Sequence, residues 1–215
     1  MQPEIQKILK SFFIKFQAKS FVKGKTVIIG GKDRRVFFLT RGVVRMFSIQ
    51  RGTELTLNIY KQYALFPMAL VLNNQKDRYK YDALTDVEGY FAPKKEFEKF
   101  LNKNPKVLFD LLGRIYRGLE GFFMRMETLL SGDAHFRILT QLVIYSRRFG
   151  QSERGRITFD WHLTHQELAS QTGLARETVT KEIKKLQDKG FVGYIGKKLV
   201  IYDLPSLEEE CFVSS

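Results

Sequence analysis

The chain has 215 residues, of which 44% are hydrophobic and 13% aromatic, and its formal net charge is +13. This length and composition fit one large or two small globular domains and exclude a disordered chain. No apolar run approaches the roughly 18 residues of a membrane span and no signal-peptide layout is present, so we expect a cytoplasmic protein without a membrane partner. The basic balance favours a polyanionic partner such as nucleic acid, although plain solubility explains it equally well.

The first half of the chain predicts a helix followed by a β-rich domain. Residues 4–17 have the pattern of a short amphipathic helix. Residues 20–93 alternate short runs of Val, Ile and Phe with glycine-marked turns, such as the turn at residues 30–33. Strands at this roughly ten-residue spacing predict an antiparallel sandwich or barrel.

The pattern becomes helical after Pro93, with a short helix predicted over residues 94–102 and a long one opened by Pro105. Apolar residues then recur at alternating spacings of four and three: Leu108, Leu112, Ile115, Leu119, Phe122, Met126 and Leu129. This heptad row predicts a dimer interface, and the alternative is a helix packed on its own domain. Four further residues widen this apolar face, namely Phe109, Leu111, Phe123 and Leu130. We therefore expect part of the face to pack inward.

Three glycines weaken this long helix, namely Gly113, Gly118 and Gly121. Each costs about 1 kcal/mol relative to alanine, so the helix needs tertiary or partner contacts. Ser131-Gly132-Asp133 interrupts it, and Asp133 is the expected cap of a helix over residues 134–149 that ends at Gly150.

Residues 164–189 predict a helix-turn-helix. Thr164 and Glu167 have the spacing of a capping box, and Gly173 suits the turn between the two helices. In the second helix, from about Ala175 to Lys189, three residues form the buried face: Val179, Ile183 and Leu186. The opposite face is polar and carries Arg176, Glu177, Thr180, Lys181 and Lys184.

This polar face has the chemistry of a reader of the DNA major groove. Arginine donates two hydrogen bonds to guanine and glutamate accepts from cytosine, so Arg176 and Glu177 are the predicted base readers. The alternative is a solvated ion pair at the start of a helix. Candidate contacts to the DNA backbone are Thr164, His165, Gln166, Ala175, Thr178, Thr180 and Lys197. Lys197 and Lys198 lie beside Gly196 in a predicted β-hairpin wing, where exposed turn lysines are an equal alternative.

The segment from Thr164 to Val179 resembles the helix-turn-helix signature of the Crp–Fnr family of bacterial transcription regulators. The resemblance implies an α+β fold with a β-roll or jelly-roll sensor over residues 1–105, a dimerisation helix over 106–131 and a winged helix-turn-helix over 132–215. It also implies a homodimer that reads a palindromic, TGTGA-like site and has RNA polymerase as a further partner. Lys181 matches the family's second base-reading arginine, and lysine lacks that residue's bidentate fork.

Sensors of this family often bind a cyclic nucleotide, haem or an iron–sulfur cluster, and we expect none of these cofactors here. The cluster needs several cysteines, and Cys211 is the only one, which also excludes an internal disulfide and a cysteine-ligated zinc site. Haem would need a ligand in the sensor half, and all three histidines lie in the second half of the chain. The resemblance places a nucleotide pocket at Phe66, Pro67, Met68, Arg78, Phe122 and Phe123. Its pattern is broken at Pro67, Met68, Asp77 and the two phenylalanines of the long helix, and Arg78 is placed to compensate in part for Asp77. Met68 replaces the glutamate that would hold the ribose.

Two alternatives to a switched transcription regulator stay open at this point. One is a ligand-independent or architectural DNA binder, and the other is an effector-binding module that acts through protein partners. No phosphate-binding loop, metal-spaced histidine set or nucleophile elbow is present, so we expect no enzyme. Residues 1–131 hold 24 Lys and Arg against 12 Asp and Glu, and this excess would attract either the flanks of bent DNA or an anionic effector.

Overall fold

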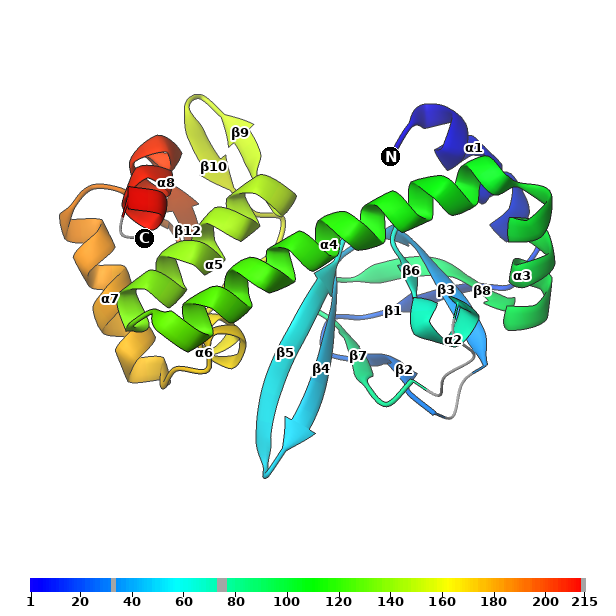
Figure 1. The fold of residues 1–215 in the computed structure, drawn as a ribbon, viewed down its shortest axis with the longest axis horizontal. Coiled ribbons are helices and arrows are strands. Elements are labelled where there is room, and N and C mark those ends of the chain that lie inside the picture. Colours follow the sequence, from blue (N-terminus) through cyan, green and yellow to red (C-terminus); the bar gives the residue numbers. More distant parts are fainter. Residues whose placement is uncertain (32–33, 73–76, 214–215) are drawn as a thin grey trace. The chain divides into compact units, whose positions relative to one another are not determined.

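The structure, a computed structural model, describes residues 1–31, 34–72 and 77–213 (Figure 1). The chain divides into two compact units, Met1–Arg117 and Gly118–Ser215, and the boundary falls within the long helix α4, Pro105–Ser131. Of the turn predicted at residues 30–33, Lys32 and Asp33 lie outside the described residues.

The first unit contains two four-stranded sheets, with strand orders β1-β8-β3-β6 and β2-β7-β4-β5. Every strand pairing in them is antiparallel, and the predicted α+β fold with an N-terminal antiparallel β domain is confirmed. The strands are β1 Ala18–Phe21, β2 Thr26–Ile29, β3 Arg35–Arg41, β4 Val44–Gln50, β5 Thr53–Tyr60, β6 Leu65–Phe66, β7 Lys80–Ala83 and β8 Val87–Pro93. The helices that accompany them are α1 Pro3–Phe13, α2 Met68–Leu72 and α3 Lys94–Lys103.

Strand β3 explains how one sheet serves two hydrophobic cores. Its four central residues, Val36 to Leu39, are all fully buried. Because successive side chains of a strand point to opposite faces, both faces of β3 must be covered. Val36 and Phe38 pack with α1, α3 and the start of α4, while Phe37 and Leu39 pack toward the second sheet. A continuous apolar run therefore marks a strand covered on both faces rather than a half-exposed one.

The start of α4 is anchored in the first unit. Val107 and Leu111 are buried in the same core as α1 and α3. Arg114 Nη1 donates to the backbone oxygen of Tyr63 at 2.8 Å, and Arg114 Nε lies 3.1 Å from Asp110 Oδ2. Burial lowers the pKa of the Arg114 guanidinium, although Asp110 works in the opposite direction.

The second unit is built around α5, Ala134–Phe149, whose middle is buried from Ile138 to Ser146. Helices α6 His165–Thr172, α7 Arg176–Asp188 and α8 Leu204–Val213 all pack on it. A small sheet has the strand order β11-β12-β10-β9, and its strands are β9 Gln151–Glu153, β10 Arg156–Thr158, β11 Val192–Ile195 and β12 Lys198–Ile201. The predicted wing is β11 and β12, whereas the β9–β10 hairpin and α8 were not predicted.

The predicted junction between α4 and α5 is confirmed. Asp133 is the N-cap of α5, and its Oδ1 accepts from the backbone N–H of Phe136 at 2.9 Å. Gly150 follows α5, and a Cβ there would lie 2.4 Å from the Ser146 oxygen, so the site requires glycine for space. Within residues 1–31, 34–72 and 77–213, no helix is long and apolar enough to cross a membrane.

Candidate nucleic-acid interface

The predicted start of the helix-turn-helix is confirmed atom by atom. Thr164 Oγ1 accepts from the backbone N–H of Glu167 at 3.1 Å, and Glu167 Oε2 accepts from the backbone N–H of Thr164 at 2.8 Å. This capping box satisfies two of the donors that every helix start leaves over. After α6, Gly173 has a φ of 66°, a left-handed conformation that favours glycine. The turn at Gly173 therefore sets the direction in which α7 leaves α6.

Helix α7 has the two faces that its sequence predicts. Val179, Ile183 and Leu186 are completely buried. The polar residues on the other side are all exposed, namely Arg176, Glu177, Thr180, Lys181 and Lys184. Thr178 is half-buried, while Gln166 on α6 is exposed. The three predicted base readers therefore share one open helix face.

The first turn of α7 also presents backbone donors. Ala175 is its N-cap and, within the described part of the chain, provides no side-chain hydrogen bond to that turn. The start of α6 has such a cap and the start of α7 does not. The N–H groups at a helix start carry a partial positive charge and suit an anion such as a phosphate.

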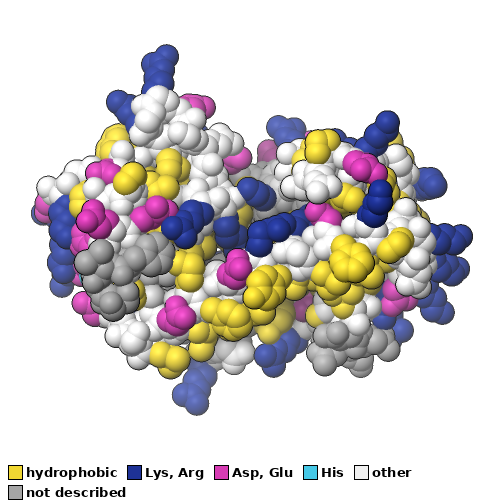
Figure 2. All heavy atoms as spheres, turned by 45° about the horizontal axis from the view of Figure 1, so that its top comes forward, with side chains coloured by type: hydrophobic (Ala, Val, Ile, Leu, Met, Phe, Trp, Pro, Cys, Tyr) yellow, Lys and Arg dark blue, Asp and Glu magenta, His cyan; other side chains and the backbone are white. Residues whose placement is uncertain are grey.

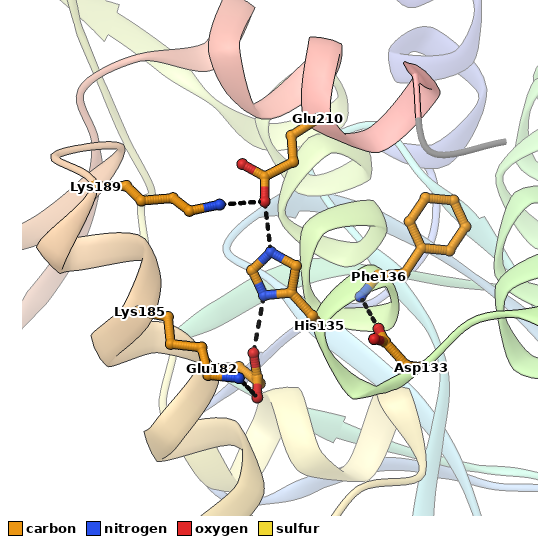
Figure 3. Close-up of polar contacts among 7 residues, drawn as sticks. All are labelled: Asp133, His135, Phe136, Glu182, Lys185, Lys189 and Glu210. Carbon is orange, nitrogen blue, oxygen red and sulfur yellow. Dashed lines mark hydrogen bonds and ion pairs between the residues drawn. The ribbon is translucent and has the colours of Figure 1, made fainter.

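A histidine-centred network that the sequence did not reveal holds α7 in place (Figure 3). His135 on α5 lies between two carboxylates, with Nδ1 2.8 Å from Glu182 Oε2 on α7 and Nε2 2.7 Å from Glu210 Oε1 on α8. Lys185 pairs with Glu182 at 2.7 Å, and Lys189 pairs with Glu210. Burial raises the pKa of both carboxyl groups, but the hydrogen bonds from these lysines and from His135 outweigh it and lower the pKa of each.

A second histidine joins α7 to the wing. His165, the first residue of α6, has Nδ1 2.8 Å from Thr180 Oγ1 on α7 and Nε2 2.7 Å from Tyr194 Oη on β11. The sequence predicted backbone contacts from His165 and Thr180, and the structure adds that both side chains already have partners within the protein. Tyr194 is a candidate that sequence reasoning missed, because nothing local ties residue 194 to residue 165.

At the tip of the wing, Lys197 and Lys198 are exposed and Gly196 has a φ of 61°. The predicted hairpin is confirmed, with Ile195 opposite Lys198 at the end of the ladder. This arrangement presents the two ammonium groups to solvent, as a contact to a DNA backbone requires.

The heptad row on α4 is largely uncovered. Leu112, Ile115, Leu119, Phe122, Met126 and Leu129 are all exposed in the single chain. Leu108 differs from these residues, because it is partly buried against the core of the first unit, and its place in a dimer interface stays a prediction. Figure 2 shows hydrophobic side chains gathered in a band that follows α4.

A neighbouring row makes this apolar face wider than the heptad alone. Phe109, Tyr116, Phe123 and Leu130 repeat every seven residues and are 74%, 63%, 52% and 81% exposed. Of the four residues that widen the face, Leu111 is buried and the other three are exposed, so the expectation that part of the face packs inward is confirmed. A seven-residue repeat keeps these side chains on one edge of the heptad row.

Four of the residues predicted to line an effector pocket belong to the first unit, namely Phe66, Pro67, Met68 and Arg78. Phe66 is completely buried and its ring stacks on Tyr81, with 5.0 Å between centroids and 6° between planes. Arg78 is exposed and lies over the ring of Tyr79 at 5.4 Å, rather than pointing inward. Phe66 is therefore part of a hydrophobic core of the first unit, and its place in an effector pocket stays a prediction. Phe122 and Phe123 belong to the second unit and are exposed there.

Pro67 follows Phe66 through a cis peptide bond and is buried, and Met68 is half-buried against the core. Asp77 is also buried, and its Oδ1 accepts from the backbone N–H of Tyr79 at 3.2 Å. An ionised carboxylate at this position would repel an anionic ligand such as the phosphate of a cyclic nucleotide.

Known proteins resemble both halves of the chain. Residues 18–104 match the cyclic nucleotide-binding domain family, and residues 136–210 match the Crp-like helix-turn-helix domain family. A global nitrogen regulator of Nostoc sp. strain PCC 7120 is 29% identical over 196 residues, which cover 89% of this chain and 88% of that protein. The transcriptional regulator SdrP of Thermus thermophilus is 29% identical over 195 residues, which cover 88% of this chain and 92% of that protein.

Solved structures agree with this assignment. A Crp/Fnr-family transcriptional regulator from Thermus thermophilus has a TM-score of 0.71 and 28% identity, and the match covers 91% of this chain and 98% of that one. A mutant CooA from Carboxydothermus hydrogenoformans has a TM-score of 0.77 at 20% identity, covering 92% of this chain and 88% of that one, and it supports the fold alone. With its roll, its long helix and its capped helix-turn-helix, the chain belongs to the Crp–Fnr family of transcription regulators.

Proposed function

We propose that the protein is a homodimeric, sequence-specific DNA-binding transcription regulator that reads a palindromic site. The observation that carries this proposal is the exposed polar face of α7, which is held by a capped helix and a left-handed glycine turn. A positioned helix with arginine and glutamate at its start fits the major groove, where each base pair has a distinct pattern of donors and acceptors.

Arg176 and Glu177 are the proposed base readers of a TGTGA-like half-site, with Lys181 as a third. Lysine offers a point charge in place of a fork, so Lys181 contributes less discrimination than arginine would. The uncapped N–H groups after Ala175 suit a DNA phosphate, and Lys197 in the wing supplies a further backbone contact. Thr164, Gln166 and Thr178 complete the proposed backbone set.

The proposed dimer interface is the exposed row from Leu112 to Leu129 on α4. Large apolar side chains gathered on one helix face mark an association surface, and their heptad spacing suits a second copy of the same helix. Two copies would present two α7 helices, which explains the expected two-fold symmetry of the DNA site.

We further propose that the roll does not bind a cyclic nucleotide and that the protein needs no cofactor. Phe66 fills the interior with its ring, and buried Asp77 carries a charge of the same sign as a phosphate. This favours regulation without a nucleotide, including DNA binding that is independent of any ligand. RNA polymerase is the expected partner of the DNA-bound dimer.

The experiment is selection of bound duplexes from a random library, followed by fluorescence anisotropy on the selected site and on a scrambled one. Arg176→Ala should lose roughly 1–3 kcal/mol of the difference between the two duplexes. Lys184→Ala is the matched control, because the loss of a lysine–phosphate contact weakens binding to both duplexes equally. Equal affinity of the wild-type protein for both duplexes would overturn sequence-specific reading.

A further inference from the structure

His165 makes a chain of hydrogen bonds whose direction can be assigned. Thr180 Oγ1 donates to the backbone oxygen of Arg176 at 3.0 Å, so this hydroxyl has no second hydrogen to donate to His165. With the Thr180 hydrogen used in this bond, the Nδ1 of His165, 2.8 Å away, carries a hydrogen and donates to Thr180. Of the two neutral tautomers of the ring, only the one with hydrogen on Nδ1 makes this bond.

The other ring nitrogen then determines the direction of the Tyr194 hydroxyl. In a neutral ring with hydrogen on Nδ1, Nε2 is an acceptor, so Tyr194 Oη donates to it across 2.7 Å. The hydroxyl hydrogen of Tyr194 then points toward His165. In a protonated ring, Nε2 donates instead, and the same hydroxyl hydrogen turns away from the ring toward solvent.

We propose that His165 is a positioning residue that couples the recognition helix to the wing and that, through its protonation, directs the Tyr194 hydroxyl toward a DNA backbone phosphate. This inference rests on the proposed DNA-binding function and adds a contact, Tyr194, and a control over it. Tyr194 lies on the wing strand that also leads to Lys197, and its side chain is partly exposed.

Burial and neighbouring charges determine whether the His165 ring is neutral or protonated. Burial and then the neighbouring Arg176 guanidinium lower the pKa of His165, so the free protein holds the neutral ring at neutral pH. The groups that bear on the ring are Arg176 from α7 and the Tyr194 phenol from β11, whose own pKa burial raises. A phosphate placed beside His165 has the opposite effect to Arg176, because an anion favours the imidazolium.

DNA binding and proton uptake at His165 are then linked. If DNA raises the pKa of His165, affinity must rise as the pH falls, with a limit of tenfold per pH unit for one proton. Because the contact is to the backbone, selected and scrambled duplexes should show the same pH dependence. The discrimination between bases by Arg176 should not change with pH.

The test is anisotropy between about pH 5.5 and pH 8, the range in which a histidine titrates, on a selected and a scrambled duplex. The wild-type affinity should rise about threefold per pH unit on acidification, below the one-proton limit. His165→Gln, which keeps a donor and an acceptor but does not titrate, should flatten that slope on both duplexes. Tyr194→Phe should weaken binding at low pH, and His162→Gln is the matched control because His162 is exposed on the loop before α6.

Nitrogen-15 NMR of the free wild-type protein supplies a readout that does not depend on any variant. It should report the Nδ1–H tautomer for His165 at neutral pH, and the Nε2–H tautomer would overturn the inference. An unchanged pH slope in His165→Gln would overturn it while leaving DNA reading intact. Absence of wild-type binding to every duplex would overturn the proposed function and this inference together.

Discussion

His135 Nδ1 and Glu182 Oε2 lie 2.8 Å apart, and this contact joins the central helix α5 to α7, the second helix of the helix-turn-helix. The Glu182 carboxylate is buried, and Lys185 and His135 are its hydrogen-bond partners. A buried carboxylate that loses a partner retains the cost of its desolvation. This contact therefore predicts how the second unit responds to mutation and to acid.

Removal of the imidazole should destabilise the second unit. His135→Ala leaves Glu182 and Glu210 each without one hydrogen-bond partner, and we expect a loss of about 1–3 kcal/mol in the free energy of unfolding. Urea denaturation followed by Trp161 fluorescence measures this, since Trp161 is buried in the second unit. His162→Ala, at an exposed position, is the control, and equal losses in the two variants would contradict the prediction.

Acid should weaken the same network. The pKa of Glu182 and that of Glu210 are below their usual value near 4.5, so both groups stabilise the fold above that value. This stabilisation is lost as the pH falls through the lowered pKa values of the folded protein. Glu182→Gln should make the melting temperature less dependent on pH below about pH 4.5. A melting curve that keeps its full acid dependence in this variant would count against the assignment.

The exposed heptad row predicts a dimer in solution. The wild-type protein should have twice the 25.1 kDa mass of one chain by sedimentation equilibrium. Leu119→Glu places a charge in the row and should shift the mass toward one chain, because burying an unpaired charge is strongly unfavourable. Arg117→Glu, two positions back and about 160° around the helix, should leave the mass unchanged. A wild-type monomer at every concentration would refute the interface.

The filled roll predicts that titration calorimetry with cyclic AMP and with cyclic GMP will give no binding heat at micromolar concentrations. The ring of Phe66 occupies the interior, and Met68 offers no carboxylate to a ribose. Micromolar binding of either nucleotide would contradict the proposal that the roll holds none. Thermal unfolding with and without ligand is an independent check, because a ligand that binds only the folded state stabilises it.

Duplex length should reveal what the basic charge of residues 1–131 does. If DNA flanks contact these lysines, a long duplex should show a steeper fall in affinity with salt than a short one, by roughly 0.9 in the log–log slope for each additional phosphate contacted. Equal slopes for the two lengths would assign the charge excess to another anionic partner. Protein at the same concentration on a scrambled pair of duplexes controls for non-specific binding.

Local patterns predicted the elements that depend on near neighbours. The Thr164 capping box, the Gly173 turn and the Asp133 cap each involve residues at most four positions apart, and all three were predicted correctly. Contacts between distant residues were not predictable in this way. His135 meets Glu210 across 75 positions and His165 meets Tyr194 across 29, and no spacing rule connects such pairs.

The heptad row shows where periodicity is informative and where it stops. Its spacing correctly marked one apolar face of α4, but it did not predict which residues of α4 are buried and which are exposed. Leu108 packs into its own unit while Phe109, one residue later, is exposed. Burial at each position depends on the sheet and helices nearby, which the periodicity of a single helix does not contain.

The stacked rings of Phe66 and Tyr81 also make the roll a starting point for an engineered sensor. Phe66→Ala would remove a fully buried ring at a cost of about 3–5 kcal/mol and leave an apolar void among the remaining aromatic side chains. Voids of this kind stay dry and accept small aromatic molecules. An added aromatic compound that restores the stability of such a variant would give the experimenter a chemical input to this domain.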